Sequence, residues 1–201
     1  MAKKILIAPA VLCVVLLVAC VVISLQPSTF SVQRSATMAS PPAKVFAQVN
    51  DLQAWDSWTP WKELDPNPKA TISDPSAGKG ATFAWSGNDQ IGEGTMTILE
   101  SKPDEWVELK QVFVRPFAGK ARMTFTFSSV GDGTKVTWRM DGTNNFMGKA
   151  MCLFMDMDVV LGEKFARGLA NMKAVVEKSA RAHQYAAGGA AGHPGQNSAP
   201  A

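Results

Sequence analysis

The side chains that most often carry out acid–base or nucleophilic chemistry are scarce in this chain. Its histidines are His183 and His193 and its tyrosine is Tyr185, so all three lie close to the C-terminus. A histidine-activated serine or cysteine, a histidine-rich metal site and a tyrosine acid are therefore excluded from the central part of the chain. We expect no catalytic residue set, no metal site and no cofactor.

Charged side chains offer little more. Asp156 and Asp158 are two residues apart and would not share a helix face, so we interpret them as charges that favour the N-terminus of a helix. Arg139 and Asp141 fall on the polar face of a predicted strand and are interpreted as a surface pair. The sequence contains no glycine-rich phosphate loop and no Gly-x-Ser-x-Gly motif.

Apolar binding is the chemistry that the remaining residues could perform. Large aromatic and methionine side chains recur on the apolar face of the predicted strands and helix, where they could line a cavity or fill a closed core. Gln111 is in phase with Leu109 and Phe113, so its amide could bind a ligand on that face or satisfy a backbone group. The candidate lining residues are Trp58, Trp61, Phe83, Trp85, Met96, Ile98, Gln111, Phe113, Phe125, Phe127, Trp138, Met140, Met151, Phe154, Met155, Phe165, Leu169 and Met172.

Two further segments are rich in flexible or aromatic side chains. In residues 144–157, Met147, Met151 and Met155 recur every fourth residue and would align on a helix. That segment could form a pliable lip over a pocket or an ordinary helix that closes one end of the core. A cluster of three tryptophans could cap the core or form the wall of an entrance; its members are Trp55, Trp58 and Trp61.

The hydropathy pattern predicts an antiparallel sheet followed by one long helix. Apolar Met123, Phe125 and Phe127 alternate with polar residues, which gives the sheet one dry face and one wet face. From Leu161 to Val176 apolar residues recur every three or four positions, as on one face of a helix. We predict strands at 29–39, 81–85, 92–100, 106–114, 120–130 and 135–143, a helix capped by Ser40, a short helix and loop at 51–61, and a long helix from 158 onward.

The two ends of the chain differ in composition from its centre. Residues 5–25 carry no charge and are long enough, at ~1.5 Å per residue, to cross the ~30 Å hydrocarbon core of a membrane. Lys3 and Lys4 precede them, so the positive-inside rule places the N-terminus in the cytoplasm and the domain outside, in the periplasm if the source is bacterial. A lipoprotein modified at Cys20 is the alternative. The C-terminal residues are small and polar and predict a disordered tail.

The domain map that follows is a cytoplasmic N-terminus at 1–4, a transmembrane anchor at 5–25, a linker at 26–29, a folded domain at 30–181 and a disordered tail at 182–201. The net charge of the whole chain is +3, and Lys3 and Lys4 lie outside the folded domain. A nearly neutral domain is not typical of a nucleic-acid-binding protein. Only Cys152 lies within the domain, so no disulfide can form there.

Several short motifs occur in a familiar order. Ser-Pro-Pro-Ala-Lys-Val-Phe at 40–46 is followed by Trp-x-x-Trp-x-Pro-Trp at 55–61, Gly-Glu-Gly-Thr-Met at 92–96 and Gly-Thr-Lys-Val-Thr-Trp at 133–138. Phe-Met-Asp at 154–156 then precedes Gly-Leu-Ala-Asn-Met-Lys at 168–173. Over about residues 30–180 the chain resembles the SRPBCC superfamily of START-like, birch-pollen-allergen-like and polyketide cyclase/dehydrase-like helix-grip proteins, and most of all its membrane-anchored subset.

The resemblance implies an α+β fold in which about seven antiparallel strands curve around a long C-terminal helix and enclose a hydrophobic cavity. Members of the superfamily bind lipids, hormones or polyketides, and some are enzymes, so the fold does not assign a function. The sequence favours a membrane-anchored domain that binds a small hydrophobic or amphipathic ligand. The alternatives are a cyclase or dehydratase acting on a hydrophobic carbonyl compound, and a protein-interaction module that docks through residues 147–157.

Overall fold

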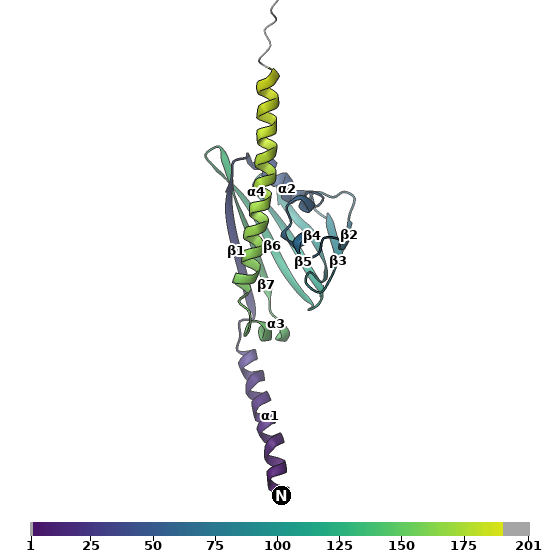
Figure 1. Ribbon diagram of the computed structural model, residues 1–201, viewed down its shortest axis with the longest axis vertical. Helices are drawn as coiled ribbons and strands as arrows, with labels where there is room; N and C mark the ends of the chain where they lie inside the picture. Colours follow the sequence, from purple (N-terminus) through teal and green to yellow (C-terminus); the bar gives the residue numbers. More distant parts are fainter. Residues whose placement is uncertain (1, 191–201) are drawn as a thin grey trace, which may run out of the picture.

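The chain folds as a seven-stranded antiparallel sheet with helices on one face, an α+β arrangement (Figure 1). The computed structural model describes the backbone of residues 2–190 and the side chains of residues 11–179. The elements in chain order are α1 (Ala2–Ser24), β1 (Thr29–Met38), α2 (Pro42–Asn50), the 3₁₀ turns η1 (Ala54–Ser57) and η2 (Pro60–Glu63), β2 (Lys69–Ile72), β3 (Thr82–Ser86), β4 (Glu93–Lys102), β5 (Trp106–Arg115), β6 (Gly119–Val130), β7 (Gly133–Thr143), α3 (Phe146–Met151) and α4 (Met157–Ala190).

The strands follow the order β1-β7-β6-β5-β4-β3-β2, so the first strand pairs with the last and the others form a meander. The register pairs Phe125 with Trp138 and Met123 with Met140, which places these four side chains on one face. The alternation in β6 and β7 therefore predicted their inner face correctly. The short edge strand β2 was missed because Lys69–Ile72 offers only four residues and little alternation.

Helix α4 lies along the inner face and packs mainly on β1, whereas β2 to β5 extend to one side of it (Figure 1). The Phe165 ring stacks on Trp138, with ring centroids 4.1 Å apart and ring planes 11° apart. Gly168 permits this close approach, because a Cβ atom there would lie 3.0 Å from Trp138 Cζ3 and 3.1 Å from Pro60 Cδ. The predicted apolar stripe of the long helix is thus the face that packs on the sheet.

The start of α2 differs from the prediction. Its N-cap residue is Pro41, and no side chain caps the helix. Ser40 is buried and its hydroxyl has no hydrogen-bond partner in the structure, while its carbonyl oxygen accepts a hydrogen bond from Thr134 Oγ1 at 2.7 Å. Pro42 makes a side-chain cap less necessary, since a proline near the first helical position has no N–H to satisfy.

The ends of the chain also bear on the predicted domain map. Helix α4 continues to Ala190, so residues 182–190, predicted to be part of a disordered tail, are helical. Three of the six residues from Tyr185 to Ala190 are alanine, which has the highest helix propensity. The remaining tail residues lie outside the described part. Within the part of the chain that the structure describes, no helix is both long and apolar enough to span a membrane.

An ion pair joins the beginning of α4 to β1. The Arg34 guanidinium donates hydrogen bonds to both carboxylate oxygens of Asp158 at 2.9 Å and to its carbonyl oxygen at 2.8 Å. Hydrogen bonding to Arg34 lowers the pKa of Asp158 below its ordinary value. Asp158, interpreted from sequence only as a helix-terminal charge, therefore also fixes α4 to the sheet.

Asp158→Asn is expected to destabilise the domain at neutral pH and to have less effect in acid. A carboxyl whose folded-state pKa is lowered contributes fully above the unfolded-state pKa of about 3.9, and this contribution is lost as the pH falls through the folded-state pKa. Urea unfolding of the wild type and the variant across that range measures the difference. Asp89→Asn, in the exposed turn after β3, is the control. A constant difference down to strongly acidic pH would contradict the assignment.

Candidate ligand-binding site

The predicted lining residues separate into two groups on the inner face, and the first forms a closed core. Trp58, Phe125, Trp138 and Phe165 interlock, with ring centroids 4.9 Å apart for Phe125 and Trp138 and 5.8 Å apart for Trp58 and Trp138. In this structure they contact one another and not an open space. The buried members of the predicted set are Trp58, Met96, Ile98, Phe125, Phe127, Trp138, Met140, Phe165, Leu169 and Met172.

The second group is half-buried and lies on β3 and β5, to the side of α4. Phe83 and Trp85 are nearly parallel, at 19° with ring centroids 6.0 Å apart, and Phe113 meets Trp85 edge-on at 6.1 Å. The Trp85 indole donates a hydrogen bond to the carbonyl oxygen of Ile91 at 3.1 Å, which fixes the ring. We call Phe83, Trp85, Phe113 and Gln111 the aromatic shelf. Trp61 and Met151 are the other half-buried members of the predicted set.

Small residues lie beside the shelf in the cross-strand rows. Phe113 lies between Gly94 on β4 and Gly119 on β6, and Gln111 pairs with Ala121. The Trp85 ring covers Gly94, where a Cβ atom would come within 2.6 Å of the indole. A Cβ atom at Gly119 would meet nothing within 4 Å. The rows thus combine bulky aromatic side chains with neighbours that occupy little volume.

Gln111 provides a polar group on this otherwise apolar surface. Its Oε1 atom is buried and has no hydrogen-bond partner in the structure. A buried acceptor without a partner costs about 1–3 kcal/mol, and a ligand hydroxyl or amide could provide the missing donor. Trp138 Nε1 is also buried without a partner, but its ring is held within the closed core.

Two predicted lining residues lie outside the interior. Phe154 is 86% exposed and Met155 is also exposed, so here the structure corrects the prediction. The physical reason is the length of α3, which ends at Met151 after six residues. The chain then turns, and Met147, Met151 and Met155 do not form one helical face. The segment lies at one end of the domain, a position that fits either of the two predicted roles, a lip over a pocket or a helix that closes one end of the core.

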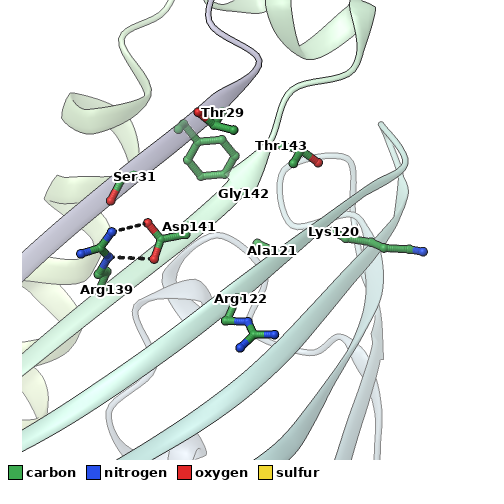
Figure 2. A pocket seen from close by; sticks show the side chains of 10 residues that line it. Thr29, Ser31, Lys120, Ala121, Arg122, Arg139, Asp141, Gly142 and Thr143 are labelled. Carbon is green, nitrogen blue, oxygen red and sulfur yellow. Dashed lines mark hydrogen bonds and ion pairs between the residues drawn. The ribbon is translucent and has the colours of Figure 1, made fainter.

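Two open hollows lie on the outward face of the sheet. One, of about 730 Å³, is open and lined by residues at the ends of β1, β6 and β7 that include Lys120, Arg122, Arg139 and Asp141 (Figure 2). Arg139 binds Asp141 through two hydrogen bonds of 2.7 and 2.8 Å, as the sequence predicted for a surface pair. The other, of about 480 Å³, lies across β2 to β5.

The carboxyls with shifted pKa values do not suit proton donation. Hydrogen bonds from Lys79, Arg139 and Arg34 lower the pKa values of Glu100, Asp141 and Asp158, respectively. These groups stay ionised at neutral pH and cannot serve as general acids there. Among the residues that the structure describes, no three acidic, cysteine or histidine side chains cluster in a way that could hold a metal ion.

Sequence comparison supplies the family. Residues 29–177 match the profile described as polyketide cyclase / dehydrase and lipid transport. The chain belongs to this family. The family match, together with the helix-grip arrangement of a curved antiparallel sheet and a long C-terminal helix, places the chain in the SRPBCC superfamily. No curated protein matches the sequence.

Solved structures agree on the fold. Protein CV1439 from Chromobacterium violaceum aligns with a TM-score of 0.54 and 17% identity over 75% of this chain and 98% of its own. Protein MLL2253 from Mesorhizobium loti aligns with a TM-score of 0.55 and 14% identity over 74% and 98%. Ara h 8.0201 aligns with a TM-score of 0.52 and 13% identity over 75% and 99%. At these identities the likeness establishes the fold alone.

Sequence reasoning missed some residues around the site. Met123 is buried opposite Met140, between the closed core and the row of Gln111, yet it was not among the predicted lining residues. Its alternation with Phe125 was a sufficient signal. Arg34 gave no signal of its own, because its partner Asp158 is 124 positions away.

Proposed function

We propose that this domain binds a small hydrophobic or amphipathic molecule on the aromatic shelf of β3 and β5, to the side of α4. The observation that carries the proposal is the pairing of half-buried aromatic rings with the unpartnered acceptor Gln111 Oε1 on the inner face. The rings would bury the apolar body of the ligand, and Gln111 would orient a hydroxyl or amide. The family description, which includes lipid transport, supports the same class of ligand.

Apolar burial would supply most of the affinity. Each methylene removed from water contributes about 0.8 kcal/mol, and part of this is offset by the loss of free motion on binding. A chain of eight to ten carbons would contribute at most about 6–8 kcal/mol, so its dissociation constant would be no tighter than about the micromolar range. Met96, Met123 and Met140 are buried in the core of the inner face, and flexible methionines can rearrange to admit a longer chain.

We also propose that α1 holds the domain at a membrane, with the domain on the outer side. The support is the uncharged run at 5–25 after Lys3 and Lys4, together with the exposure of the large apolar side chains of α1 that the structure describes, from Val11 to Val22. Water does not favour a helix that exposes apolar residues in this way. An anchored domain would meet apolar ligands where they are concentrated, in the lipid.

Native mass spectrometry of the full-length protein in detergent tests the ligand proposal. After incubation with a total lipid extract, we expect a defined mass increment from one retained small molecule, which a second, competing lipid would displace. A protein that remains unliganded with every lipid class would contradict ligand binding. Membrane attachment is read independently, from flotation of the protein with vesicles in alkaline carbonate.

A further inference from the structure

We propose that the end of the domain nearest α1 lies on the bilayer surface and inserts apolar side chains into it. This inference rests on the proposed anchor. We call the inserting residues the apolar corner: Phe117, from the turn between β5 and β6, and Phe146, Met147, Leu153, Phe154 and Met155, from α3 and the turn that follows it. All six are exposed in the structure.

Hydrogen bonds hold the segments of the apolar corner together. Asn145 Nδ2 donates a hydrogen bond to the carbonyl oxygen of Ala118 at 3.0 Å, which joins the start of α3 to the turn that carries Phe117. The N–H groups of Phe154 and Met155 both donate to the carbonyl oxygen of Met151 at 2.9 Å, so the turn after α3 is ordered. A gathered apolar surface of this kind marks an interaction site.

Contacts between the corner and the end of α1 determine how far the corner would lie from the centre of a membrane. Lys149 Nζ donates to the carbonyl oxygen of Ser24 at 3.0 Å, and Asn144 Nδ2 donates to that of Pro27 at 3.2 Å. Figure 1 shows α3 beside the end of α1 that joins the domain. The apolar run ends at Leu25, so these contacts place α3 where an anchored helix would leave the hydrocarbon core.

The chemistry of the corner suits lipid. Phenylalanine, leucine and methionine side chains can enter the boundary between headgroups and acyl chains to a depth of about 5–10 Å. Lys149 at α3 and Lys120 at the start of β6 provide positive charge at the same end for phosphate groups. Of the two acidic residues that follow α3, Asp156 accepts hydrogen bonds through Oδ1 from the backbone N–H groups of Asp158 and Val159, at 2.9 and 3.4 Å, and Asp158 pairs with Arg34.

This placement would also shorten the path of a ligand. Phe113 of the aromatic shelf and Phe117 of the corner flank the end of β5, four positions apart. A bilayer in contact with the corner would therefore lie next to the shelf. An apolar molecule could then move between lipid and shelf with little exposure to water.

Depth-dependent fluorescence quenching tests the inference on the full-length protein in phosphatidylcholine vesicles. In a background in which Cys13, Cys20 and Cys152 are replaced with serine, a polarity-sensitive label is attached in turn to Leu16→Cys, Phe154→Cys and Val130→Cys. Val130 is the matched control, because it is 50% exposed but is the last residue of β6 and pairs with the start of β7, at the opposite end of that strand from α3. Lipids carry the quencher either near the headgroup or deep in the acyl chain.

We expect the deep quencher to act on the label at 16, the shallow quencher to reduce emission at 154 severalfold, and neither to act at 130. If the label at 16 is quenched but the label at 154, like the one at 130, is not, the inference is overturned and the anchor stands. Absence of quenching at 16 would overturn the anchor, and the inference with it. A label at 154 that is shielded from aqueous iodide without lipid would show that protein covers the corner, which also overturns the inference.

Discussion

Replacing Phe165 with alanine is expected to lower the free energy of unfolding by about 3–5 kcal/mol. The ring is fully buried between α4 and the sheet and stacks on Trp138 at a centroid distance of 4.1 Å. Its removal would leave a cavity between α4 and β7, where the Phe165 ring now stacks on Trp138. Urea unfolding followed by circular dichroism in detergent measures the change.

Val159→Ala is the matched control on the same helix. Val159 is 51% exposed, so its truncation should change the free energy of unfolding by no more than about 0.5 kcal/mol. If Phe165→Ala lowered the free energy of unfolding as little as Val159→Ala, the space between α4 and the sheet would not be tightly packed. The ligand site would then have to extend beneath α4. The experiment therefore separates the residues that hold the fold from those that could bind a ligand.

Replacing Trp85 with alanine is expected to weaken binding of a fluorescent fatty acid, dansyl-undecanoic acid, about ten- to hundredfold. Loss of a large apolar contact surface removes about 1.5–3 kcal/mol of apolar burial, and each 1.4 kcal/mol is a factor of about ten in the dissociation constant. Fluorescence titration of the full-length protein in detergent measures it. Circular dichroism establishes that the variant remains folded.

Trp106→Ala is the control for this prediction. Trp106 is also half-buried, but it begins β5 on the outward face and should not contact the ligand. We expect the affinity of that variant to stay within about twofold of the wild type, a difference of about 0.4 kcal/mol. Equal weakening by both variants would exclude the shelf as the specific site.

The architecture could be predicted from sequence because it follows from periodicity. Alternation in β6 and β7 identified the inner face, and the stripe from Leu161 to Val176 identified the packed face of α4. The features of the sheet that the sequence did not predict are determined by tertiary contacts. The two register shifts between β4 and β5, for example, depend on the pairing of distant residues and leave no local signal.

The candidate site was only partly predictable, because an aromatic face has the same pattern whether it packs or binds. Trp138 and Trp85 both fit the apolar alternation, yet the first is 1% exposed and the second is half-buried. What separates them is the path of α4, which packs along β1 and stacks Phe165 on Trp138, whereas β3 and β5 lie to one side of it. Phe154 shows the converse, since the end of α3 at Met151 turns it outward.

Fluorine NMR of protein labelled with fluorotryptophan tests most directly whether a ligand occupies the shelf. The chain has six tryptophans, and each labelled ring gives one resonance. The resonance that disappears in the Trp85→Phe variant is that of Trp85. On addition of lauric acid we predict that the Trp85 resonance shifts while those of Trp55 and Trp106 do not. A shift confined to the resonances of Trp58 and Trp138, or no saturable shift at any tryptophan, would contradict the account.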